Sequence, residues 1–400
     1  MDILKLTPET LKGKDLNSKD VDGKTLFHQI CSRNDLNKTI LHQCLDQGAD
    51  LNIPNKYGYT PFQELCMNTF DPEIITICKD ANFNHANMYG STPFHYLCNR
   101  PFINLDLLKI CISYGANIHS KDFYDRTPFY FLCPKVTLEM LQYCLELNVN
   151  LNETVKEYDI SVSKCVSGDT PFHQLCQNKN MNMQMLDLCI SKGANLNNSY
   201  NNNKTPFYYM CINDLVTPEM FHYCLLLNTT FDLMWICKSK YMTLDMLKTC
   251  INANGNLDSR NSENETAFYH LCSKCDLEML EYCLSLNADL NARSNYGFTP
   301  FHRLCARGDM TLVKRCLGEN NGNLNNRTQY GNTALYDLLG NAHVIDMDLL
   351  KKCIEHNGDL NIQTSYGDTP FHNLCYNESM TPEMLQYCLN EGKADGKVKM

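Results

Sequence analysis

A ten-residue sequence that recurs along the chain places the tightest limit on its fold. Close copies begin at Tyr89, Tyr296 and Tyr366, and each reads Tyr-Gly-x-Thr-Pro-Phe-His-x-Leu-Cys. Within a copy, glycine suits a tight turn, threonine can cap a helix, and proline suits the first helical position. Phenylalanine, with leucine and cysteine three and four residues later, falls on one helical face. Each copy therefore predicts a turn followed by a helix with one apolar face.

The copies recur at the interval of a repeat array. Their threonine returns every 32 to 36 residues, apart from intervals of 43 and 61, at Thr25, Thr60, Thr92, Thr127, Thr170, Thr205, Thr266, Thr299, Thr333 and Thr369. The interval of 61 holds one weak copy at residues 231–237, so we predict eleven repeats. Their predicted boundaries are 21–55, 56–87, 88–122, 123–165, 166–200, 201–228, 229–261, 262–294, 295–328, 329–364 and 365–395. Residues 1–20 are predicted to form an N-terminal half-repeat cap, and residues 396–400 a short tail.

The second half of each repeat predicts another helix. Residues 137–145 and 381–389 both begin with a capping threonine and an early glutamate, and apolar residues follow at helical spacing. The helix then ends in glycine or asparagine, as at Gly48 and Gly115, which suits a left-handed turn. One repeat is therefore predicted to be a helix, a turn, an antiparallel helix and a protruding loop.

This unit closely resembles the ankyrin repeat, whose pattern is Gly-x-Thr-Pro-Leu-His-x-Ala-Ala, then a second helix and Gly-Ala-Asp-Val-Asn. The resemblance covers nearly the whole chain. Phenylalanine replaces the family's leucine, Leu-Cys replaces Ala-Ala, and cysteine takes one leucine position of the second helix. We interpret these changes as a core repacked with a larger phenylalanine and a smaller cysteine. The resemblance implies an all-α ankyrin-repeat solenoid of stacked helix-turn-helix units with protruding hairpin loops.

Most of the 23 cysteines follow the two helices of the repeat. One column closes the Leu-Cys of the first helix: Cys31, Cys66, Cys98, Cys133, Cys176, Cys211, Cys237, Cys272, Cys305 and Cys375. The other column lies in the second helix: Cys44, Cys78, Cys111, Cys144, Cys189, Cys224, Cys250, Cys283, Cys316, Cys353 and Cys388. Reduced cysteine is a small hydrophobic residue, so we interpret both columns as core packing, with disulfides or metal binding as the alternative. Cys165 and Cys275 belong to neither column.

The interval of 43 residues comes from an insertion within residues 153–165. Its alternation of apolar and polar residues predicts an extended hairpin. Two interpretations stay open. The insertion is either a tolerated surface loop, since longer loops cost little entropy, or a contact finger that carries a free thiol at Cys165.

Charge and hydropathy restrict the partners. The formal net charge is −10, from 35 Lys and Arg against 45 Asp and Glu, which argues against nucleic acid as the main ligand. The first residues lack the apolar core of a signal peptide, and no apolar run reaches the length of a membrane span. We expect a monomeric cytoplasmic protein in a reducing compartment, with no membrane insertion.

No pattern for catalysis or cofactor binding stands out. The resemblance implies that the motif histidines bond to neighbouring backbone; they are His28, His95, His173, His302 and His372. Cys272 and Cys275 form a lone C-x-x-C, for which a structural role competes with a redox or metal role. The chain lacks a phosphate-binding glycine-rich loop and a hydrolase nucleophile motif. We therefore expect no enzyme activity, no cofactor and no metal.

Binding remains, and the resemblance implies a concave groove lined by the loop tips and the outer face of the first helix. Three residues before the motif threonine, most repeats have tyrosine, while the central ones have Ser167, Asn202 and Glu263. These tyrosines either pack over the neighbouring turn or anchor a partner. Two further positions vary between repeats: the residue just before the motif threonine, and the first-helix residue just before Leu-Cys. Such variation fits a binding surface, and it also fits sequence drift on a solvent-exposed face. The candidate partner-binding residues are Tyr57, Tyr59, Tyr89, Tyr96, Tyr124, Arg126, Phe131, Tyr209, Tyr296, Phe298, Arg303, Tyr330 and Tyr366.

These features together predict a protein-protein interaction module or scaffold. It would bind one or more partner proteins through the concave face and the hairpin tips, without catalysis. Two alternatives stay open. The first is a secreted pathogen effector that binds host proteins. The second is a thiol-rich metal or redox buffer, which solvent-facing cysteines would favour.

Overall fold

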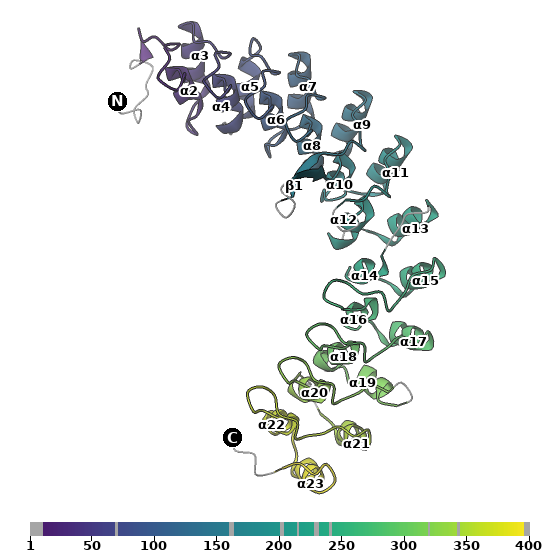
Figure 1. The fold of residues 1–400 in the computed structure, drawn as a ribbon. Helices are drawn as coiled ribbons and strands as arrows, with labels where there is room; N and C mark the ends of the chain where they lie inside the picture. Colours follow the sequence, from purple (N-terminus) through teal and green to yellow (C-terminus); the bar gives the residue numbers. More distant parts are fainter. Residues whose placement is uncertain are drawn as a thin grey trace. The chain divides into compact units, whose positions relative to one another are not determined.

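The structure, a computed structural model, consists of helix pairs that follow one another along the chain (Figure 1). It describes residues 11–68, 71–159, 164–200, 204–213, 216–227, 232–239, 242–318, 321–341 and 345–395. The first ten residues of the predicted cap and the predicted tail lie outside these ranges. The chain divides into two compact units, unit 1 (residues 1–210) and unit 2 (residues 211–400), and each is described by itself.

Unit 1 contains first and second helices in alternation. The first helices are α2 (Leu26–Cys31), α4 (Pro61–Asn68), α6 (Pro93–Cys98), α8 (Pro128–Leu132), α10 (Pro171–Leu175) and α12 (Pro206–Ile212), the last of which crosses the unit boundary. The second helices are α3 (Lys38–Asp46), α5 (Pro72–Ile77), α7 (Leu105–Ser113), α9 (Leu138–Glu146) and α11 (Met183–Ser191). A 3-10 turn, η1 (Cys133–Lys135), extends α8.

Unit 2 continues the same alternation. Its first helices are α14 (Leu233–Ile236), α16 (Ala267–Leu271), α18 (Pro300–Arg307), α20 (Ala334–Asn341) and α22 (Pro370–Tyr376). Its second helices are α13 (Pro218–Leu226), α15 (Leu244–Asn252), α17 (Leu277–Ser285), α19 (Met310–Cys316), α21 (Met347–Glu355) and α23 (Pro382–Asn390). The weak copy at 231–237 does form a helix, α14, which Asp232 caps in place of threonine.

Like helices pack against like helices within each unit. In unit 1, α2, α4, α6, α8 and α10 contact one another in turn, and α3, α5 and α7 form a second row beside them. In unit 2, α14, α16, α18, α20 and α22 form the first row, and α17, α19 and α21 form the second. This arrangement confirms the predicted helical solenoid. The repeat boundaries given above remain a proposal from the sequence.

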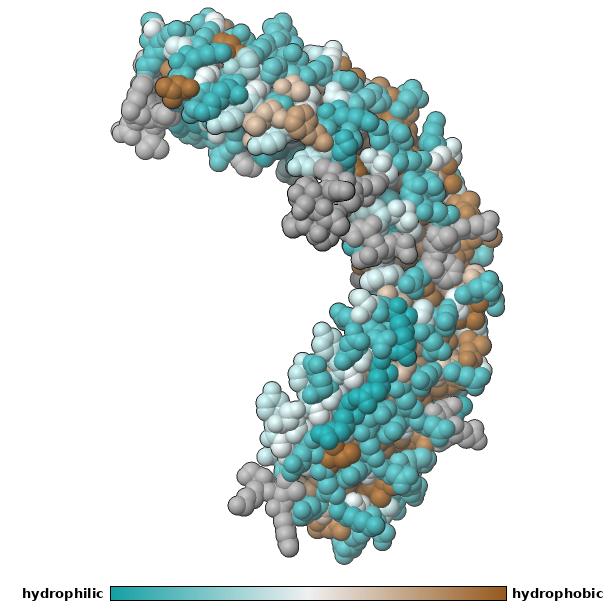
Figure 2. All heavy atoms as spheres, viewed as in Figure 1, coloured by the Kyte–Doolittle hydropathy of each residue, from teal (hydrophilic) through white to brown (hydrophobic). Residues whose placement is uncertain are grey.

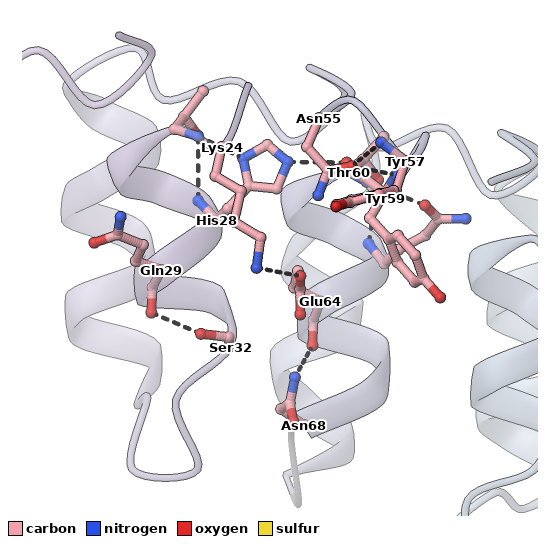
Figure 3. Close-up of polar contacts among 12 residues, drawn as sticks. Lys24, His28, Gln29, Ser32, Asn55, Tyr57, Tyr59, Thr60, Glu64 and Asn68 are labelled. Atoms are coloured by element: carbon pink, nitrogen blue, oxygen red, sulfur yellow. Dashed lines mark hydrogen bonds and ion pairs between the residues drawn. The ribbon is translucent and has the colours of Figure 1, made fainter. Parts of the chain in front are cut away.

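The motif threonine and histidine together start the first helix. The Thr25 hydroxyl accepts the His28 backbone N–H (3.2 Å), and His28 Nδ1 accepts the Thr25 backbone N–H (3.0 Å). Because Nδ1 is an acceptor, the ring proton lies on Nε2, which donates to the Tyr59 carbonyl in the next repeat (2.9 Å). Figure 3 shows this link between α2 and the loop before α4. The same capping box recurs at His95, His173, His302 and His372, so the predicted structural role of the histidines is confirmed.

The protruding loops follow tight turns that need a left-handed residue. Gly58 has φ +77°, and a Cβ atom there would lie 2.9 Å from the Asn87 Cα of the next loop. The loops are also joined by backbone hydrogen bonds, since the Tyr57 carbonyl accepts the Met88 N–H (2.9 Å). Glycine therefore lets successive loops approach closely enough to pair.

An asparagine ladder, which the sequence analysis missed, ties successive repeats together. The Asn84 side chain donates to the Gly115 carbonyl (2.7 Å) and accepts the Asn117 N–H (2.8 Å), both in the next repeat. The same pair of hydrogen bonds is made by Asn17, Asn52, Asn152, Asn291, Asn325 and Asn361. These residues satisfy backbone groups at the end of each second helix.

The two cysteine columns lie in the core with the motif phenylalanines, as predicted. Phe94 and Cys98 are fully buried, and burial raises the pKa of the Cys98 thiol well above its usual value. Cys375 is the exception among the described cysteines, because it is exposed. The core-packing prediction is wrong for this residue: in the described part of the chain, no further repeat covers the outer side of α22. The side chain of Cys165 lies outside the described residues.

The insertion forms the predicted hairpin. Strands β1 (Lys156–Asp159) and β2 (Lys164–Ser167) pair antiparallel, with Lys156 opposite Ser167. The hairpin base is joined to the repeat before it, since the Lys156 N–H donates to the Tyr124 carbonyl (2.7 Å). Residues 160–163, at its tip, lie outside the described residues. Across the described ranges, every helix is too short or too polar to cross a membrane.

Candidate partner-binding groove

The structure divides the candidate binding residues between the two units. Unit 1 holds Tyr57, Tyr59, Tyr89, Tyr96, Tyr124, Arg126, Phe131 and Tyr209, and unit 2 holds Tyr296, Phe298, Arg303, Tyr330 and Tyr366. Six of these are the loop tyrosines, for which the sequence left two interpretations open: packing over the neighbouring turn, or anchoring a partner. The exposed fraction of each side chain distinguishes them. Tyr89 is 50% exposed and Tyr124 40%, so each ring leans on its surroundings and keeps an open face. Tyr366 is 87% exposed.

The first cleft of unit 1 lies between the loops before α6 and α8. It has a volume of about 270 Å³ and is lined by Tyr89, Ser91, His95, Tyr96, Asn99, Tyr124, Arg126 and Phe131. Five of these were candidate residues from the sequence. The loops supply Tyr89, Tyr124 and Arg126, and the first helices supply Tyr96 and Phe131.

A second cleft adjoins the first. It has a volume of about 380 Å³ and is lined by Tyr124, Arg126, Tyr130, Val155, Lys156, Asp169, Gln174 and Tyr200. Tyr124 and Arg126 line both clefts, so the two form one continuous surface across the loops and first helices of residues 89–200. We call the residues that line either cleft the tyrosine groove.

Arg126 is held in place where the two clefts meet. Its guanidinium lies over the Tyr124 ring (4.8 Å to the centroid) and the Phe131 ring (4.9 Å). The Asp122 carboxylate, which is itself buried, accepts hydrogen bonds from Nε (2.8 Å) and contacts Nη2 (2.7 Å). The Arg126 side chain remains 33% exposed. A planar charged group is thus fixed in orientation and still open to a ligand.

The floor of the second cleft is polar and hydrogen-bonded. Asp169 is only 6% exposed, and it accepts the Tyr130 hydroxyl (2.9 Å) and the Gln174 amide. Burial, and then the neighbouring Asp169 charge, raise the pKa of Tyr130. The Tyr130 hydroxyl therefore stays protonated and acts as the donor to Asp169.

Tyrosine pairs extend the surface at both ends of the groove. Tyr200 and Tyr209 stack with ring centroids 6.3 Å apart, and their hydroxyls hydrogen-bond to each other. At the other end, the Tyr59 and Tyr96 ring centroids lie 6.5 Å apart. The Tyr96 hydroxyl accepts the Asn87 amide (2.8 Å). These contacts limit the rotamers available to the rings before any partner binds.

Unit 1 begins with a turn of the same kind, drawn in Figure 3. The Asn55 side chain accepts the N–H groups of Tyr57 (2.9 Å) and Tyr59 (3.0 Å). Lys24, just before α2, forms an ion pair with Glu64 of α4 (3.8 Å). Burial raises the pKa of Glu64, and Lys24 partly offsets that effect. Tyr57 and Tyr59 are therefore positioned by their own loop, one repeat before the groove.

In unit 2 two of the candidate residues, Arg303 and Phe298, make separate ring contacts. The Arg303 guanidinium lies over the Tyr269 ring (4.6 Å), and the Phe298 and His302 rings meet edge to face at 5.9 Å. Tyr330 is half exposed on its loop. The Arg303 contact is of the same kind as that of Arg126 with Tyr124.

The groove includes residues that the sequence analysis did not propose. Tyr130 stands where five repeats have the motif histidine, and Tyr200 stands where five have the asparagine or aspartate of the turn. Lys156 and Val155 come from the base of the inserted hairpin. Departure from the repeat consensus in neighbouring repeats was the signal that could have found the two tyrosines.

On the face in view in Figure 2, the rows of first helices show mostly hydrophilic residues, and hydrophobic ones gather over the second helices. Among the described residues, no three His, Cys, Asp or Glu side chains are placed to hold a metal ion.

Comparison with known families agrees with the fold. The family model for ankyrin repeats in many copies matches residues 268–315. That segment covers α16 to the end of α19 and includes the motif beginning at Tyr296. The chain contains ankyrin repeats. A search of curated proteins found no match. Ankyrin repeats generally act as protein-protein interaction modules, and the family is typically non-catalytic.

Proposed function

We propose that this ankyrin-repeat protein is a non-catalytic scaffold that binds a partner protein through the tyrosine groove of unit 1. The observation that carries the proposal is Arg126, shared by both clefts and fixed by Asp122, Tyr124 and Phe131. Tyrosine and arginine dominate the residues that contribute most to binding at protein interfaces. A partner side chain that meets this surface gains contact area with an already oriented guanidinium.

Pre-organisation supports the same proposal. Binding costs free energy when side chains must be immobilised, about 0.5–1.5 kcal/mol for each flexible one. The hydroxyls of Tyr130, Tyr200 and Tyr96 are already hydrogen-bonded within the groove. Tyrosine also has few rotatable bonds, so these rings offer contact area at small entropic cost.

As a second part of the proposal, the hairpin tips and the loop tyrosines of unit 2 also contribute to partner binding. Loop tyrosines such as Tyr330 keep half of their surface open, which leaves them available to the same or another partner. We propose a monomer in a reducing, cytoplasmic compartment, and the packing of the cysteine columns as small core side chains supports the reducing compartment. A thiol buffer is less well supported, because Cys375 is the one exposed thiol among the described cysteines.

A hydrogen-exchange footprint tests the proposal. The full-length chain is used to capture proteins, and one captured protein is purified and added back at saturation. We expect slower exchange in the loops and first helices of residues 89–131 and 168–209. Slowing confined to the second helices α7, α9 and α11 would contradict the groove as the binding surface.

A further inference from the structure

Cys275 stands outside both cysteine columns, one helical turn after Cys272. The Cys275 N–H donates to the Leu271 carbonyl (2.8 Å), so the backbone continues the turn of α16 through Cys275. In such a turn, residues three apart have Cα atoms about 5 Å apart. This separation is within the range that a disulfide requires. The backbone therefore already brings the two cysteines to bonding range.

The two sulfur atoms interact with each other and with an arginine of the next repeat. The Cys272 thiol donates a hydrogen bond to the Cys275 sulfur. Arg307, the last residue of α18, places Nη1 3.9 Å from Cys275 Sγ and 2.7 Å from the Cys275 carbonyl oxygen. Nη1 also reaches the Cys272 carbonyl (3.4 Å). The guanidinium is thus fixed on the backbone of the C-x-x-C turn, with its charge beside one sulfur.

The pKa of Cys275 is shifted in the opposite direction from those of the column thiols around it. The hydrogen bond from Cys272, and then Arg307, lower the pKa of Cys275. Burial raises the pKa of the neighbouring Cys283 and Cys316 to about 12. Since the thiolate is the reactive form, Cys275 is the nucleophile of this cluster and Cys272 is its nearest thiol.

We propose that Cys272 and Cys275 are a peroxide-responsive disulfide site, a modification separate from partner binding in unit 1. The Cys275 thiolate attacks the O–O bond of a hydroperoxide, takes its terminal OH as a sulfenic acid, and releases the other oxygen as hydroxide or alkoxide. The Cys272 sulfur then attacks the Cys275 sulfur and the S–O bond breaks. Water leaves as the S–S bond forms. Two thiols lose two electrons, and one peroxide O–O bond is reduced.

The burial of both thiols limits the size of the oxidant that can reach them. Cys272 is 0% exposed and Cys275 is 1% exposed, so a small hydroperoxide enters during local opening and bulky disulfides such as oxidised glutathione are excluded. The loop that the disulfide closes has only two intervening residues, so its effect on global stability is small. The disulfide should therefore be detected directly, by mapping which cysteines are bonded, and not by a change in stability.

The test uses the full-length reduced protein titrated with hydrogen peroxide. Remaining thiols are blocked with N-ethylmaleimide in denaturant, and peptides are mapped by mass spectrometry. We expect a Cys272–Cys275 disulfide, lighter by two hydrogens, at doses below those that oxidise Cys375, the exposed comparison thiol. The rate of its formation should fall severalfold in Arg307→Met and recover in Arg307→Lys.

Controls separate the pair from general thiol oxidation. Arg315→Met removes a guanidinium that pairs with Glu281 on the second-helix layer, and it should leave the rate unchanged. Cys275→Ser should abolish the disulfide at Cys272 and not redirect it to Cys283 or Cys316. The proposal is overturned if peroxide oxidises Cys375 before any Cys272–Cys275 linkage forms, or if Arg307→Met reacts at the wild-type rate.

Discussion

Acid should destabilise α10 through His173, and replacement by glutamine should remove much of that effect. His173 is 1% exposed, and burial lowers its pKa to about 4. Its Nδ1 accepts the Thr170 N–H (3.1 Å), so protonation would break the capping box. As pH falls from 6.5 toward 4, the unfolded chain binds a proton at this histidine that the folded chain does not, and stability falls.

The magnitude follows from the two pKa values. With 6.5 in the unfolded chain and about 4 in the folded one, His173 reduces stability by about 2 kcal/mol at pH 5.0 and by almost nothing at pH 7.5. Another repeat of this chain already has glutamine at the position of the motif histidine. In the second repeat, Gln63 Oε1 accepts the Thr60 N–H (3.0 Å), and Nε2 donates to the His85 and Ser91 carbonyls (both 2.9 Å).

Native-state hydrogen exchange of the α10 peptide reports the opening of this repeat, because repeat arrays can open in part. After correction for intrinsic exchange, the wild type should lose about 2 kcal/mol of opening free energy between pH 7.5 and 5.0 from this residue. His173→Gln should keep that opening free energy to within about 1 kcal/mol at pH 7.5. Equal losses in the wild type and His173→Gln at pH 5.0 would refute the reasoning.

Two further substitutions test the packing between repeats and a buried charge. Asn84→Ala removes both ladder hydrogen bonds and should cost about 1–2 kcal/mol in urea unfolding, while Asn84→Asp, which keeps the acceptor, should cost less; equal effects would contradict the acceptor role. Asp337 has a pKa raised to about 6 by burial. Asp337→Asn should therefore stabilise the fold by about 3 kcal/mol at pH 7.5 and about half of that at pH 5.0; a gain independent of pH would contradict the shift.

The fold was predictable because its signals are local and repeated. The threonine cap, the proline and the apolar positions of one motif determine one helix, and recurrence at 32 to 36 residues predicts stacking. The cysteine columns followed from the same periodicity. The exposure of Cys375 did not, because it depends on whether a neighbouring repeat covers the position.

The groove was predictable only in part. Tyr89, Tyr124 and Arg126 were found by their position in the loop. Tyr130 was not found because it replaces the motif histidine, whose role was taken to be structural, and Tyr200 was not found because its turn position was not considered. The asparagine ladder was also missed, since its hydrogen bonds join residues about one repeat apart, as at Asn84 and Asn117. Such contacts depend on how repeats stack and not on the pattern within one repeat.

The affinity of the captured partner for two arginine variants tests the central claim most directly. Arg126→Ala removes the residue shared by both clefts, and Arg315→Ala removes an equal charge from the second-helix layer of unit 2. Calorimetry should show at least about tenfold weaker binding for Arg126→Ala, or about 1.4 kcal/mol, with Arg315→Ala close to the wild type. Wild-type affinity in a correctly folded Arg126→Ala protein would contradict the claim that the tyrosine groove binds the partner.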